Sequence, residues 1–132
     1  MVHSLRPQQI QMIQSFLEEK LKPSMIWLFG SAVRETLNPE SDIDLAFFSD
    51  GDFDGYQVFM VAQELASMIG KEIDLIDLKK ASTVMKAQII GKGKLIYQQD
   101  NRQRMIFEMK AFKEYALLNE ERQPILERFG NS

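Results

Sequence analysis

The sequence contains no cysteine and only one histidine, His3. Without cysteine the chain can form no disulfide, no thiolate metal site and no cysteine nucleophile. His3 stands at a chain end that we expect to fray, so we interpret it as a surface residue rather than a catalytic base. Redox chemistry and zinc-finger folds are therefore excluded together.

Long apolar runs are also absent. The longest uninterrupted runs have about five residues, far fewer than the roughly 20 that a bilayer-spanning helix needs. A secretion signal has a basic segment followed by an apolar one, and the first 22 residues do not show this pattern. We therefore expect a cytoplasmic protein without membrane association.

The chain has 132 residues, of which 45% are hydrophobic and 27% charged. This composition predicts one compact domain over residues 1–132 with a single core of ordinary size. If a chain of this length transfers a group between two molecules, it has room for the donor site alone. The acceptor is then expected on a partner protein.

Charge is spread unevenly along the chain, although the net charge is only −3. Residues 1–78 carry 5 basic and 13 acidic side chains, whereas residues 79–132 carry 11 and 6. The stretch 79–104 is the most basic, and it could face phosphates, nucleic acid or an acidic partner, or be a solvated surface. The negative net charge argues against polymerisation on nucleic acid, while RNA contact stays open.

The hydrophobic pattern predicts the order helix, strand, strand, helix, strand, helix, strand, helix. Such an order indicates an α/β fold in which a mixed sheet of about four strands is flanked by helices. A C-terminal helical segment at about 102–129 closes the domain. The helices are expected at 6–21, 56–69, 82–90 and 102–118, with a helical tail at 120–128, and the strands at 25–29, 42–48, 72–78 and 94–97.

Asp42 and Asp44 interrupt a predicted strand that is otherwise apolar. Carboxylates are rare in such a strand unless something pairs with them. Because they are two residues apart, both side chains project from the same face, where they repel unless a cation lies between them. Their oxygen atoms suit Mg²⁺. The alternative is a pair at a strand end that faces solvent.

Gly30 and Ser31 end the preceding apolar strand. A glycine there allows an anion to approach the backbone, and the following N–H groups and the Ser31 hydroxyl can donate to phosphate oxygens. A lone Gly-Ser pair is usually just a turn. Its combination with Asp-x-Asp ten residues later is far more specific, and together the four residues indicate a site for a metal-bound nucleoside triphosphate.

Arg34 and Ser41 lie between these two motifs. The forked donors of Arg34 could meet a phosphate, or they could form a surface salt bridge with Glu35 or Glu40. The hydroxyl of Ser41 could contact the ligand, or it could cap the turn before the strand. We place both residues in the candidate nucleotide site.

The third predicted strand adds Asp74. A carboxylate on a neighbouring strand would complete a site for two metal ions, which in such centres lie about 3.5–4 Å apart. We select Asp74 as metal bridge or general base in preference to Glu72 or Asp77. The alternative is that all three are edge charges that discourage aggregation.

The run Leu28–Ser31, followed by Ser41–Leu45 and Ile73–Leu78, resembles the DNA polymerase beta-like nucleotidyltransferases, especially their minimal prokaryotic branch. The resemblance covers about residues 25–98. It implies that Asp42 and Asp44 bind Mg²⁺, that Asp74 is the third acidic residue of a metal site for two ions, and that Gly30-Ser31 holds the triphosphate of ATP. Glu35 stands where minimal members often have glycine, which puts the local loop shape in question.

A second likeness is to the antitoxins of HEPN-MNT toxin-antitoxin pairs. It rests on Asp77–Val84, on Gly93-Lys94 and on Glu120–Gln123. This resemblance implies transfer of AMP from ATP onto a tyrosine of a cognate HEPN ribonuclease toxin, which silences the nuclease within a hetero-oligomer. This implication agrees with the expectation from chain length that the acceptor belongs to a second protein.

Two other functions compete with this hypothesis. One is an antitoxin without catalysis that neutralises its toxin by binding alone, and the presence of all three aspartates argues against it. The other is a nucleotidyltransferase with a small-molecule acceptor, but such enzymes usually carry an additional helical domain.

Overall fold

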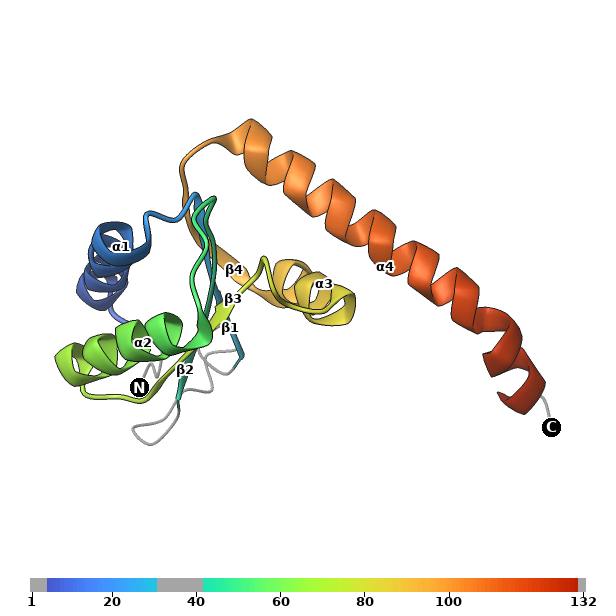
Figure 1. Ribbon diagram of the computed structural model, residues 1–132, viewed down its shortest axis with the longest axis horizontal. Helices are drawn as coiled ribbons and strands as arrows, with labels where there is room; N and C mark the ends of the chain where they lie inside the picture. The colour runs from blue at the N-terminus through green and yellow to red at the C-terminus, as the bar shows by residue number, and fades with distance from the viewer. Residues whose placement is uncertain (1–4, 31–41, 131–132) are drawn as a thin grey trace.

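A computed structural model describes residues 5–30 and 42–130, with side chains described up to residue 120. The elements follow the predicted order (Figure 1). The helices are α1 (Pro7–Leu21), α2 (Gly55–Ile69), α3 (Thr83–Lys92) and α4 (Asn101–Gly130), and the strands are β1 (Met25–Phe29), β2 (Ile43–Phe48), β3 (Ile73–Asp77) and β4 (Lys94–Gln98).

The strands form one four-stranded sheet in the order β3-β2-β1-β4. β1 pairs antiparallel with both β2 and β4, whereas β2 and β3 run parallel. The parallel pair requires the chain to cross back over the sheet between β2 and β3, and α2 makes that crossing. The predicted mixed sheet covered by helices is thus confirmed.

The helices form two layers, with α1 and α2 on one face of the sheet and α3 and α4 on the other (Figure 1). The first face is buried by alternate strand residues such as Ile43, Leu45 and Phe47. On the second face Trp27 is fully buried and its ring lies 5.9 Å from that of Phe107 on α4. The sheet is therefore covered on both faces, which suits the continuous apolar run of β1.

Several helix ends follow from local chemistry. Ser82 caps α3 by accepting a hydrogen bond from the N–H of Met85 at 3.1 Å, as predicted. Gly70 ends α2 with a positive φ of 82°, also as predicted. At the other end of α2 the Asp54 carboxylate accepts from the N–H of Gln57 at 2.7 Å. These caps determine where the chain leaves each helix for the strand or loop next to it.

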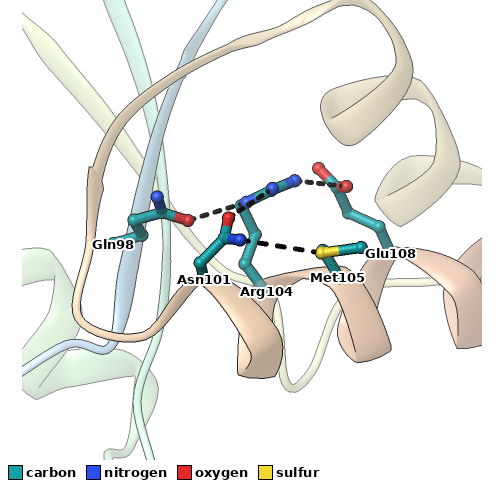
Figure 2. A network of polar contacts seen from close by, with 5 residues as sticks. All are labelled: Gln98, Asn101, Arg104, Met105 and Glu108. Atoms are coloured by element: carbon teal, nitrogen blue, oxygen red, sulfur yellow. Dashed lines mark hydrogen bonds and ion pairs between the residues drawn. The ribbon is translucent and has the colours of Figure 1, made fainter.

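The start of α4 is tied to the end of β4 by Arg104 (Figure 2). Its guanidinium donates to Gln98 at 2.7 Å, to Asn101 at 2.8 Å and to Glu108 at 2.6 Å. The Asn101 amide in turn contacts the sulfur of Met105 at 3.7 Å. These contacts join the first turns of α4 to the last residue of β4.

Two predicted boundaries were wrong. The helix expected at 102–118 and the tail expected at 120–128 are one continuous helix, α4, which passes through Pro124 and extends well beyond the sheet (Figure 1). The expected end of α3 near Ile90 is also too early, because the helix includes Gly91 and Lys92. The turn or short helix expected after Gly30 lies outside the described residues. No helix in the described ranges is long and apolar enough to cross a membrane.

Candidate nucleotide site

Three neighbouring strands bring the predicted site residues to one end of the sheet. Asp44 on β2 is the register partner of Phe29, the residue before Gly30. On its other side Asp44 is the register partner of Asp74 on β3. Asp42 precedes the start of β2 by one residue. Gly30, Asp44 and Asp74 therefore lie side by side although they are far apart in sequence.

The three aspartates also share one face of the sheet. Ile43 and Leu45 point into the core beneath α1 and α2, so the alternating Asp42 and Asp44 project toward the face that α3 and α4 cover. On β3 the same alternation places Asp74 on the face of Ile76, opposite Ile73. Asp42 and Asp74 are exposed, and Asp44 is half-buried.

The other two candidates for the third carboxylate are placed differently. Asp77 alternates with Ile73 and Leu75 toward the opposite face, and its carboxylate accepts a hydrogen bond from the N–H of Lys79 at 3.0 Å. Glu72 lies just before β3, and its backbone carbonyl accepts from the N–H of Ile43 at 2.9 Å. The strand register thus favours Asp74, which stays our choice.

Gly30 is held in a conformation and an environment that require glycine. Its φ of 74° is in the left-handed region that side chains disfavour. A Cβ at this position would overlap the Asp44 carboxylate, whose Cγ would lie only 3.1 Å away. The missing side chain leaves room for the carboxylate beside the backbone turn.

The carboxylates influence one another electrostatically. Burial raises the pKa of the Asp44 carboxyl above its usual value, and the negative charges of Asp74 and Asp42 raise it further. Each effect disfavours the ionised form of Asp44. A cation between these carboxylates would relieve the repulsion.

The carboxylate oxygens of Asp42, Asp44 and Asp74 are the candidate ligands for Mg²⁺ at this site. Among the described residues no three acidic or histidine side chains are grouped so that they could chelate one ion. Mg²⁺ usually takes only one or two carboxylates and completes its shell with water and substrate phosphates. Oxygen ligands spread over Asp42, Asp44 and Asp74 are chemically suited to ions that also bind a triphosphate.

Two concavities contain residues of the candidate site. One, of about 720 Å³, is lined by Phe29, Gly30, Asp44 and residues of α3. The other, of about 650 Å³, runs along β3 beside α2 and includes Asp42 and Asp74 in its lining. The three aspartates are thus divided between two separate concavities.

The α3 wall of the first concavity was not predicted. It consists of Met85, Gln88, Ile89 and Lys92. The spacing of Met85, Gln88 and Lys92 by three and four residues, which places them on one helix face, was a usable signal. Ending the expected helix at residue 90 separated Lys92 from this face. The predicted Ser31, Arg34 and Ser41 lie outside the described residues.

A glycine turn at the end of one strand beside paired aspartates on the next is the arrangement that the motifs predicted for a nucleotidyl-transferring protein. A match to the family model described as "Polymerase beta, Nucleotidyltransferase" covers residues 11–102. The chain belongs to this family, as its motifs predicted.

Known proteins with similar sequence and structure agree with this assignment. The chain is 37% identical to protein adenylyltransferase MntA of Shewanella oneidensis over 108 aligned residues. The alignment covers 80% of this chain and 76% of that protein. A crystal structure of a toxin-antitoxin with AMP-PNP matches with a TM-score of 0.84 and 32% identity, over 90% of this chain and 96% of that one.

A further solved structure is a complex of a tri-AMPylated Shewanella oneidensis HEPN toxin with an MNT antitoxin. Its matching chain has a TM-score of 0.80 and 30% identity to this chain, with 94% of this chain and 98% of that one covered. The structural similarity therefore extends over nearly the full length of this chain and of both matching chains.

Proposed function

We propose that this chain is an antitoxin that acts as an ATP- and Mg²⁺-dependent protein adenylyltransferase. Its acceptor is a tyrosine of a cognate HEPN ribonuclease toxin, which the added AMP silences. The observation that carries the proposal is the alignment of Asp44 with Asp74 across β2 and β3, next to Gly30. The relatives that form toxin-antitoxin complexes, one with AMP-PNP and one with an AMPylated toxin, support it.

The donor side of the reaction falls to Gly30 and Ser31. In this proposal the N–H groups and the hydroxyl that follow Gly30 donate to the oxygens of the triphosphate of ATP. The concavity that Gly30 and Asp44 share provides the space for this donor. Asp42 and Asp44 would hold Mg²⁺ with phosphate oxygens. When bound, Mg²⁺ neutralises the triphosphate and polarises the reacting groups.

The acceptor side falls to Asp74. The tyrosine oxygen attacks the α-phosphorus of ATP, a new phosphorus–oxygen bond forms, and the bond to the β-phosphate oxygen breaks so that pyrophosphate leaves. Asp74 accepts the proton of the tyrosine hydroxyl. The concavity that Asp42 and Asp74 line lies on the side away from the donor, and it admits the partner segment that carries the tyrosine.

Label transfer tests the proposal. The protein is incubated with ATP labelled in the α-phosphate, Mg²⁺ and the protein encoded by the adjacent gene. We expect label on the partner, and a loss on the order of 1,000-fold or more in a variant with Asp42→Asn and Asp44→Asn, because several kcal/mol of charge stabilisation disappear.

A second double variant, Asp50→Asn with Asp52→Asn, removes the same charge from an exposed loop and serves as the matched control. Its transfer rate should equal that of the native protein. If the partner is neutralised without becoming labelled, the chain restrains it by binding alone and the proposal is wrong.

A further inference from the structure

The basic stretch 79–104 separates into cations with different structural roles. Lys79 donates through Nζ to the carbonyl oxygens of Asp50 and Gly51, at 3.0 Å each. Lys80 donates to the carbonyl oxygen of Phe53. These two lysines therefore hold the acidic loop between β2 and α2.

Arg104 is likewise engaged, since its guanidinium joins β4 to α4 (Figure 2). Lys92 is placed differently, because it lines the concavity that contains Gly30 and Asp44. It is the one cation among the described residues of that lining, and its side chain is exposed. Within the described part of the chain no hydrogen bond or ion pair holds its ammonium group.

The backbone fixes Lys92 beside Gly30. A Cβ on the following residue, Gly93, would overlap the carbonyl oxygen of Ile89 and lie 3.1 Å from the carbonyl oxygen of Leu28. The end of α3 is thus packed against the backbone of β1 two residues before Gly30. Lys94 then pairs with Leu28 as β4 begins. The absence of a side chain at Gly93 is what allows this close contact.

The electrostatics of the site call for such a cation. A nucleoside triphosphate next to three carboxylates concentrates negative charge in a small volume. Because like charges repel strongly at close range, a nearby cation would stabilise the bound nucleotide. An ammonium group on a flexible stem can reach phosphate oxygens and donate up to three hydrogen bonds. A lysine in the last turn of a helix also has a simpler role, because its charge interacts favourably with the helix dipole.

We propose that Lys92 binds the triphosphate of the donor nucleotide through its ammonium group, opposite Asp44 in the same concavity. The inference rests on the proposed function in that it takes the Gly30 concavity as the donor site. It adds a binding residue from α3, outside the Gly-Ser and Asp-x-Asp motifs, and it gives the basic stretch a role in the reaction.

Nucleotide binding to the full chain tests this role without the partner. Isothermal titration in Mg²⁺ measures ATP, and competition measures AMP, for the native protein, Lys92→Met, Lys92→Gln and Lys92→Arg. We expect ATP affinity to fall about 10- to 100-fold in the Met and Gln variants, a change that corresponds to one lost ion contact. AMP affinity should change less than about twofold, and Lys92→Arg should keep most of the ATP affinity.

The control is Lys86→Met on the same helix, because Lys86 does not line this concavity. It should bind ATP as the native protein does. Native ATP affinity in both Lys92→Met and Lys92→Gln, or an equal loss for ATP and AMP, would overturn the inference. Native ATP binding without any transfer to the partner would instead contradict the proposed function and leave the role of Lys92 intact.

Discussion

At the scale of single residues, the site depends on one glycine and one carboxylate that share a small space. The Gly-Ser and Asp-x-Asp motifs predicted both positions from residue types and spacing alone. The sequence could not show why Gly30 must be glycine, since the cause is contact with Asp44 across two strands. Such a contact depends on strand register, which local sequence does not encode.

Gly30→Ala should be more harmful than Gly70→Ala, although both glycines have positive φ. At Gly70 a Cβ would meet nothing within 4 Å, so only backbone strain of about 1–2 kcal/mol is expected. At Gly30 the Cβ also displaces the Asp44 carboxylate, so ATP affinity should fall by roughly tenfold or more in addition. Denaturant unfolding and nucleotide titration measure the two effects. Equal ATP binding by both variants would contradict the steric argument.

Asp44→Asn should stabilise the protein in metal-free buffer at neutral pH. The folded state raises the pKa of this carboxyl, so its contribution to stability is fully present below the unfolded-state value of 3.8 and is lost as pH rises through the folded-state value. The charged form is therefore unfavourable at pH 7. We expect a Tm increase on the order of 2–5 °C, measured by thermal unfolding.

Mg²⁺ provides the counterpart to that measurement. Because a bound cation would offset the repulsion, added Mg²⁺ with ATP should raise the Tm of the native protein more than that of the Asn variant. If, in metal-free buffer, the native protein has a higher Tm than the Asn variant, the three carboxylates do not repel one another enough to destabilise the fold.

At the scale of elements, the sequence predicted in order all eight helices and strands of residues 5–30 and 42–130. Caps and stops with a local cause, such as Ser82 and Gly70, were placed correctly. Two other boundaries were not, since α4 continues through the break expected near residue 119 and α3 runs two residues beyond its expected end. Gly91 and Gly93 look like a turn, yet Gly93 serves close packing against β1. Arg104 joins the start of α4 to the end of β4 through partners in both elements.

Arg104→Lys keeps the positive charge but removes the forked donor that contacts Gln98, Asn101 and Glu108 at once (Figure 2). Its side chain is only 21% exposed, so the lost hydrogen bonds are not fully replaced by water. We expect the free energy of unfolding to fall by about 1–2 kcal/mol. Arg102→Lys, at an exposed position of the same helix, is the control and should change stability by less than about 0.5 kcal/mol.

At the scale of the whole molecule, the sheet order β3-β2-β1-β4 creates the site by placing Asp74 next to Asp44. The pattern of apolar residues predicted a mixed sheet but not this order, because pairing between distant strands leaves no local signature. The order also separates the two concavities, one toward α3 and one toward α2. Under the proposed function, donor and acceptor bind in these two different concavities.

Phe59→Asp should impair binding of the acceptor protein without impairing binding of ATP. Phe59 is 56% exposed on α2 and lines the concavity that includes Asp74. A charge there should reduce AMP transfer to the partner about tenfold, since large apolar contacts dominate protein interfaces, while ATP affinity stays unchanged. Met68→Asp is the matched control on the same helix, because Met68 is 49% exposed and does not line that concavity. Equal transfer by both variants would place the acceptor elsewhere.

The most direct measurement is the intact mass of the partner protein after incubation with this chain, ATP and Mg²⁺. We expect the partner to gain mass in steps of one AMP, and the modified residue to be a tyrosine on fragmentation. The variant with Asp42→Asn and Asp44→Asn should leave the mass unchanged while still binding the partner. An unmodified partner whose nuclease is nevertheless silenced by the native chain would contradict the assignment of this site to AMP transfer.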